Sequence, residues 1–226
     1  MSKFLRFSSL TKKFIMALVG AFLMVFLVVH LGINLFIIPI TENHKEIFRE
    51  AVYFMTSNPL IKIMEIFLFG GFILHMILGV ILQIQNWIAR PVRYKREGWS
   101  HKSFFSKFMI HTGVIIAIFL TIHLMNFYLV KAGITSAPQG PARVADDHDF
   151  YGMAVNLFSN NTYSILYIIL IILLGFHLNH AFQSAFQSLG LDHTKYTPFI
   201  KAVGDFYSIV VPLGFCMIPL YFLIYY

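Results

Sequence analysis

Long stretches without charged residues limit this chain to one class of fold. The first, FIMALVGAFLMVFLVVHLGINLFIIPI, runs from Phe14 to Ile40 without an Asp, Glu, Lys or Arg. A bilayer core about 30 Å thick is crossed by roughly 20 apolar helical residues, so this stretch is long enough to span a membrane with some tilt. Four more uncharged stretches follow, at 66–89, 108–130, within 150–191 and at 206–226. The pattern predicts an all-α integral membrane protein with five transmembrane helices.

The composition agrees with this class. Of the 226 residues, 58% are hydrophobic and only 12% are charged, too few to cover the surface of an ordinary soluble domain. The first stretch is too long for a secretory signal, so we interpret it as a retained helix. The lone Cys216 excludes an internal disulfide and a CxxCH haem attachment. We expect one membrane domain over 1–226, with helices at approximately 13–40, 59–89, 106–131, 160–186 and 203–226.

The basic residues predict the orientation in the membrane. They cluster between the apolar stretches, which argues against nucleic acid as the partner. Twelve fall on one side of the membrane: Lys3, Arg6, Lys12, Lys13, Arg90, Arg93, Lys95, Arg96, Lys102, Lys107, Lys195 and Lys201. By the positive-inside rule this side is cytoplasmic, with the amino terminus inside and the carboxy terminus outside. The basic segment ARPVRYKREGWSHK is either a topology signal against anionic lipid or a docking surface, and the two interpretations are compatible.

Histidines inside the predicted spans are the candidate functional residues. An ionisable group in hydrocarbon is costly and indicates function, although a single one is often only a hydrogen-bond partner between helices. Each of the first four spans contains at least one histidine and the fifth contains none: His30, His75, His111 and His123, and His177 and His180. In an up-down bundle, helices one and three lie on one diagonal and helices two and four on the other. Side chains from each diagonal can therefore converge on a central cofactor.

Paired imidazoles favour haem as that cofactor. Two of them fill both axial positions of the iron and leave no position for oxygen chemistry, which favours electron transfer. Glycines in the same four spans would let a flat macrocycle approach the backbone, though glycine is also common where membrane helices pack tightly. Zinc is the competing metal, but a transport site would be expected to include membrane carboxylates. Only Glu65 lies near a span interior.

Three stretches carry a family resemblance: SSLTKKFIMALVGAFLMVFLVVHLGINL, NPLIKIMEIFLFGGFILHMILGVILQIQNWIARPVRY and GFHLNHAFQSAFQSLGLDHTKYTPFIK. They resemble the di-haem cytochrome b subunit of succinate dehydrogenases and fumarate reductases, of the type with one five-helix anchor, over nearly the whole chain. The resemblance implies four helices bundled around two b haems. It assigns His30 and His123 to the distal iron and His75 and His177 to the proximal iron. In the fourth helix His180 is the alternative, but the family ligand falls thirteen residues before Gly190, which is His177.

The resemblance also implies a function, and it implies that no residue of this chain catalyses the reaction of succinate. The subunit would anchor the complex in a bacterial inner membrane and pass electrons between an iron-sulfur subunit and a membrane quinone, expected to be menaquinone. FAD and the iron-sulfur clusters would belong to a flavoprotein and an iron-sulfur partner on the cytoplasmic face. The alternatives are the cytochrome b subunit of a hydrogenase or formate dehydrogenase and, from another class, a divalent-metal transporter.

Several further residues have two interpretations each. Glu65 is a candidate for proton exchange with a quinone, or a side chain that snorkels to the outer interface. His111 is an interfacial polar residue or a cofactor contact. A third set either meets the propionates of the proximal haem or lies at a solvated membrane edge: Ser8, Ser9, Lys12 and Lys107. Some family members carry a glutamate two positions before the fourth-helix ligand for transmembrane proton movement. Here that position is Gly175, which puts such a path in doubt.

Overall fold

The computed structural model describes residues 8–89 and 108–226, and in them the chain forms only helices, turns and loops. Within these described residues, five helical segments are long and apolar enough to cross a membrane, which confirms the predicted all-helical, multi-pass class. They are α1 (Ser9–Asn34) with the 3₁₀ turn η2 (Leu35–Ile37), α3 (Pro59–Ile88), α5 (Met109–Asn126) with α6 (Tyr128–Lys131), α8 (Asn161–Ser188) and α9 (Thr197–Tyr225). Most of the basic segment and part of the basic set lie outside the described residues: Lys3, Arg6, Arg90, Arg93, Lys95, Arg96, Lys102 and Lys107.

Polar capping residues determine where the long helices begin. The Ser8 side chain accepts a hydrogen bond from the Thr11 backbone N–H at 3.1 Å, so α1 begins before the predicted residue 13. Asn58 and Asn160 cap α3 and α8 in the same way. Such caps each contribute about 1 kcal/mol. Because Pro198 suits a first helical turn, α9 begins at Thr197 rather than at the predicted 203.

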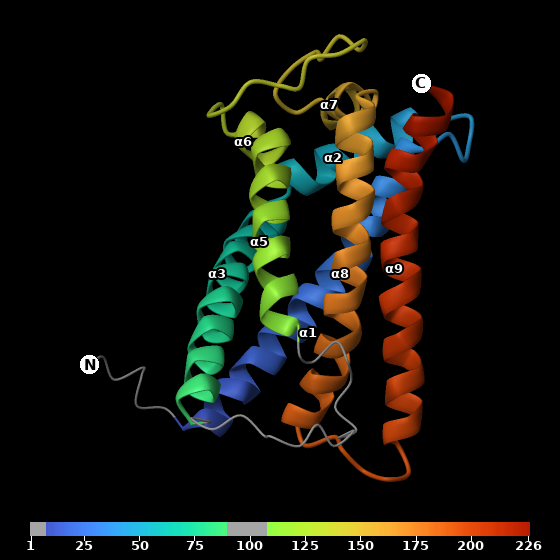
Figure 1. Ribbon diagram of the computed structural model, residues 1–226. Helices are drawn as coiled ribbons and strands as arrows, with labels where there is room; N and C mark the ends of the chain where they lie inside the picture. The colour runs from blue at the N-terminus through green and yellow to red at the C-terminus, as the bar shows by residue number, and fades with distance from the viewer. Residues whose placement is uncertain (1–7, 90–107) are drawn as a thin grey trace.

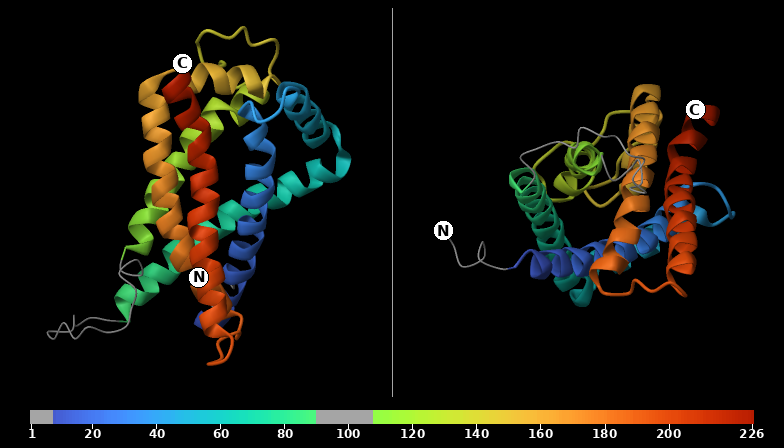
Figure 2. Two further views of the ribbon diagram at one scale, coloured as in Figure 1. Left: turned by 90° about the vertical axis from the view of Figure 1, so that its right-hand side faces the viewer. Right: turned by 60° about the horizontal axis from the view of Figure 1, so that its bottom comes forward.

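The long helices run in alternating directions (Figure 1). Helix α1 packs along α3 and α8, and α5 packs along the same two helices. Within the described residues, neither α1 with α5 nor α3 with α8 packs as closely, so each of these two pairs occupies opposite corners (Figure 2). Helix α9 lies outside this group and packs extensively on α8 and also on α1.

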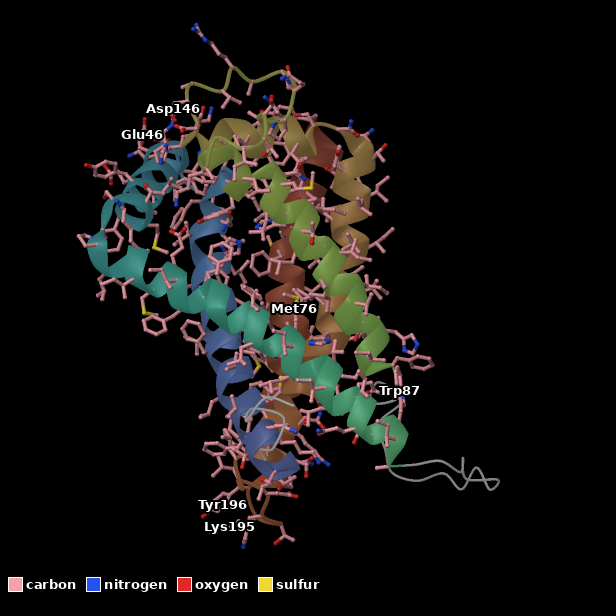
Figure 3. All side chains as sticks on the ribbon, turned by 90° about the vertical axis from the view of Figure 1, so that its left-hand side faces the viewer. Glu46, Met76, Trp87, Asp146, Lys195 and Tyr196 are labelled. Atoms are coloured by element: carbon pink, nitrogen blue, oxygen red, sulfur yellow. The ribbon has the colours of Figure 1, made fainter. Side chains whose placement is uncertain are left out.

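The two ends of the molecule differ in charge and in structure. Glu46 and Asp146 lie at one end, and Lys195 and Tyr196 lie at the opposite end (Figure 3). We call these the Asp146 end and the Lys195 end. Two helices that the sequence did not predict, α2 (His44–Ser57) and α7 (Phe150–Phe158), lie at the Asp146 end. Residues 152–158 of α7 are all buried. Four of them, Ala154, Val155, Leu157 and Phe158, belong to a hydrophobic cluster that also includes residues of α2, α8 and α9.

Candidate functional site

The structure brings His30 of α1 and His123 of α5 together from opposite corners. Their ring centroids are 5.7 Å apart and their planes are perpendicular. The Asn34 side-chain amide donates to the His30 carbonyl at 2.7 Å and lies 3.3 Å from His30 Nδ1. Both imidazoles are half-buried among aromatic rings from four helices and the α5–α6 junction: Phe26, Phe119, Phe127, Tyr167 and Phe215. Phe215 belongs to α9, a helix that sequence reasoning left out of the site because it has no histidine.

The structure also brings His75 of α3 and His177 of α8 together across the other diagonal. Their ring centroids are 6.3 Å apart, with planes inclined by 70°. Thr112 of α5 places its hydroxyl oxygen 3.3 Å from His177 Nδ1. His75 Nδ1 is buried and makes no hydrogen bond with the described part of the chain. The candidate ligand His177 therefore faces His75, as the family resemblance implies for the proximal site.

Glycines of the other two helices lie beside this second pair. A Cβ built on Gly20 of α1 would lie 3.9 Å from His75 Cε1, and one on Gly113 of α5 would lie 3.7 Å from His177 Cε1. His30 follows Gly20 by ten residues and His123 follows Gly113 by ten, which is about 15 Å along each helix. The two histidine pairs thus form two layers, and the His75–His177 layer is the nearer to the Lys195 end. Counting residues from the charged end of each helix to its histidine could not separate the two layers.

The donor set and its spacing are compatible with two haem irons, and contacts between ordinary aromatic rings have centroid distances in the same range. A metal–imidazole bond is about 2 Å, and the ring centre lies about 1 Å beyond the nitrogen, so two opposed axial imidazoles have centroids about 6 Å apart. The observed separations are 5.7 and 6.3 Å. Neutral imidazole nitrogens are the axial ligands that b-type haem uses. The buried, unpartnered His75 Nδ1 is a further indication that this pair is arranged for something other than contacts within the chain.

The remaining span histidines occupy different positions. His180, one turn after His177, is half-buried, and His111 is exposed at the start of α5, with its ring 5.9 Å from that of Phe108. In the described ranges, one group of three side chains could hold a metal ion: Asp146, Asp147 and His148. This group is exposed in the loop before α7, whereas the transporter interpretation requires such a group inside the spans.

A shallow cavity of about 540 Å³, open to the surface, lies beside Glu65 at the Asp146 end. Glu65 Oε2 is 3.3 Å from Lys131 Nζ, and Tyr128 lines the same cavity. Phe127, at φ −130° and ψ −64°, interrupts the helix, and α6 resumes there with Tyr128 and Lys131 on the cavity wall. The other wall residues are Thr56, Lys62, Ile66, Phe69 and His148. Glu65 therefore forms an ion pair within the protein. Sequence reasoning missed Lys131 and Tyr128 because the bend at Phe127 has no clear sequence signal.

The helix α9 fills the space in front of Gly175. A Cβ at this position would lie 3.0 Å from the Ser208 carbonyl oxygen and 3.2 Å from Pro212 Cγ. Contacts this short leave no room for a glutamate side chain without moving α9. The doubt about a glutamate-based proton path thus has a steric basis in this chain.

The structure describes three of the four candidate propionate-binding residues. The Lys12 side chain is buried, with 2% of its surface exposed, near the start of α1. The Ser8 hydroxyl caps α1 and lies 2.8 Å from the Thr11 hydroxyl, and Ser9 is exposed. Lys107 lies outside the described residues.

Comparisons of the chain with protein-family models, with curated proteins and with solved structures found no match, so the family resemblance depends on the residues quoted above.

Proposed function

We propose that this chain is the membrane anchor and electron-transfer cytochrome b subunit of a succinate:quinone oxidoreductase, either a succinate dehydrogenase or a fumarate reductase. One observation carries the haem part of the proposal: four span histidines form two pairs, in two layers, on the two diagonals of four helices. The succinate:quinone part rests on the sequence resemblance. A single buried histidine has many explanations, whereas two histidine pairs on the two diagonals of one set of four helices favour a shared role in binding a cofactor.

In this proposal each pair holds one b haem: His30 with His123 the distal one, and His75 with His177 the proximal one. A bound haem supplies reversible one-electron chemistry at its iron. The chain would contribute two imidazoles to each iron, which would leave no position for a further ligand such as oxygen. The aromatic residues around His30 and His123 keep water away from the distal site. Buried Lys12 is positioned near the Lys195 end, where its charge suits a propionate of the proximal haem.

The Glu65 cavity is the proposed quinone site. Its volume of about 540 Å³ lies within the range of small-molecule pockets, about 300–1,000 Å³. Phe69 and Tyr128, with ring centroids 4.7 Å apart, offer an aromatic wall for a quinone ring. The Glu65 carboxylate can exchange a proton with a quinone oxygen, and Lys131 holds this carboxylate in place when it is ionised.

The proposed orientation places the Lys195 end in the cytoplasm of a bacterium. Lys12, Lys13, Lys195 and Lys201 belong to this end, together with Asp192 and Asp205, whereas most of the acidic residues that the structure describes lie at the other end. The partner subunits, a flavoprotein with FAD and an iron-sulfur protein, would dock on the cytoplasmic face. Electrons would then pass between the iron-sulfur partner, the His75–His177 layer, the His30–His123 layer and the quinone.

Optical spectroscopy of the purified chain in lipid nanodiscs tests the haem proposal. We expect a low-spin b-type spectrum with two haems per chain and two midpoint potentials in a redox titration. A preparation that contains zinc or manganese and has no Soret band would refute the proposal in favour of a divalent-metal transporter.

A further inference from the structure

Thr112 contacts His177, one of the two candidate iron ligands of the proximal pair. No equivalent contact is made by the other ligand, His75, within the described residues. Thr112 Oγ1 lies 3.3 Å from His177 Nδ1, although the two residues are on different helices. The same oxygen lies 3.0 Å from the Met109 carbonyl and 3.4 Å from the Phe108 carbonyl. On the facing helix, His75 Nδ1 has no partner among the described residues.

The chemistry of these atoms determines where the protons lie. A threonine hydroxyl has one hydrogen to donate and two lone pairs that accept, whereas a carbonyl oxygen only accepts. The nearest acceptor for the hydroxyl hydrogen is the Met109 carbonyl, at 3.0 Å. With the hydrogen there, a lone pair of Oγ1 faces His177, which donates to it through Nδ1–H. A neutral imidazole that carries its hydrogen on Nδ1 has its lone pair on Nε2.

We propose that Thr112 is a positioning residue, which holds His177 in the tautomer that offers Nε2 to an iron and raises the basicity of that nitrogen. The inference rests on the proposed function, because it assigns a role to a contact of one proposed ligand. Metal-bound histidines commonly donate their second N–H to a fixed acceptor, and losing that acceptor costs about 10-fold to 100-fold in affinity or activity. The contact also makes the two ligands of this layer unequal, since only His177 has it.

Three variants of α5 isolate this contact. Thr112→Val keeps the shape of the side chain and removes the acceptor, and Thr112→Ser restores it. Thr121→Val is the matched control, because the Thr121 hydroxyl donates to the Ala117 carbonyl at 2.9 Å on the same helix and is exposed away from the histidines. Circular dichroism and thermal unfolding establish that each variant folds.

Redox titration in nanodiscs is the first measurement. In Thr112→Val we expect one of the two midpoint potentials to rise, because a less basic imidazole stabilises ferric iron less. We also expect about 10-fold weaker retention of one haem. Thr112→Ser and Thr121→Val should keep both wild-type potentials. Unchanged potentials and retention in Thr112→Val, with two haems present in the wild type, would overturn the role of Thr112 and leave the proposed function intact.

A second measurement needs no haem. In the cofactor-free chain with ¹⁵N-labelled histidine, we expect His177 Nδ1 to give the signal of a protonated ring nitrogen in the wild type and in Thr112→Ser. In Thr112→Val the two tautomers should mix. A wild-type signal with the proton on Nε2 would overturn the inference. Two haems per chain would still support the proposed function, whereas their absence would refute that function and this inference together.

Discussion

The space beside His75 offers a direct test of cofactor binding, through substitution of Gly20. A Cβ at Gly20 would be 3.9 Å from His75 Cε1, which is already van der Waals distance for two carbons, about 3.5–4.0 Å. Gly20→Ala therefore fits, and we expect it to keep two haems. The three additional carbons of Gly20→Leu have to occupy the space around the imidazole ring, where a macrocycle ligated by His75 would extend.

The expected size of the effect follows from this contact. Extra methylene groups in a packed site cost about 1–3 kcal/mol, and 1.4 kcal/mol corresponds to a factor of ten, so affinity for the proximal haem should fall by roughly 5-fold to 150-fold. The distal haem should be unaffected, because His30 lies about 15 Å further along α1. The assay is haem content per chain by the pyridine haemochrome method after washing, together with a redox titration.

The matched control is Gly32→Leu on the same helix. A Cβ at Gly32 would have nothing within 4 Å, so this substitution adds the same side chain without touching the proximal layer. We expect two haems and two unchanged potentials in Gly32→Leu. In Gly20→Leu we expect a lower content of the proximal haem and an unchanged distal potential. Two tightly bound haems with unaltered potentials in Gly20→Leu would refute the argument that a haem lies against His75.

Three other predictions follow from the same geometry. His177→Ala should reduce haem content from two per chain to one, while His180→Ala keeps two; the reverse result would make His180 the ligand. Glu65→Gln should lower quinone turnover by about 100-fold or more with both haems still bound, and stopped-flow haem oxidation by a quinone analogue in nanodiscs would measure this. If turnover is unaltered, Glu65 is not the proton-exchanging group. Gly175→Ala should lower the free energy of unfolding by about 1–3 kcal/mol, because its Cβ would lie 3.0 Å from a carbonyl of α9. A thermal-unfolding midpoint equal to that of the wild type would show that α9 yields without cost.

The ends of the long helices were only partly predictable. The uncharged stretches located five membrane-crossing helices, because crossing the hydrocarbon requires a minimum apolar length whatever the packing. The exact starts depended on caps such as Ser8 and on Pro198, which extended α1 and α9 beyond the apolar stretches. Helices α2 and α7 were missed because short amphipathic or apolar segments become helical through tertiary packing more than through intrinsic propensity.

The candidate site was also only partly predictable from the sequence. The sequence by itself determined that four spans carry histidines and that the fifth does not, and hence that a metal cofactor is a reasonable expectation. Only the tertiary structure decided that His30 faces His123, that His75 faces His177, that Thr112 contacts a ring nitrogen and that Lys131 reaches Glu65. The physical reason is that hydrophobicity determines which segments enter a membrane, whereas the rotation and tilt of each helix depend on packing against its neighbours.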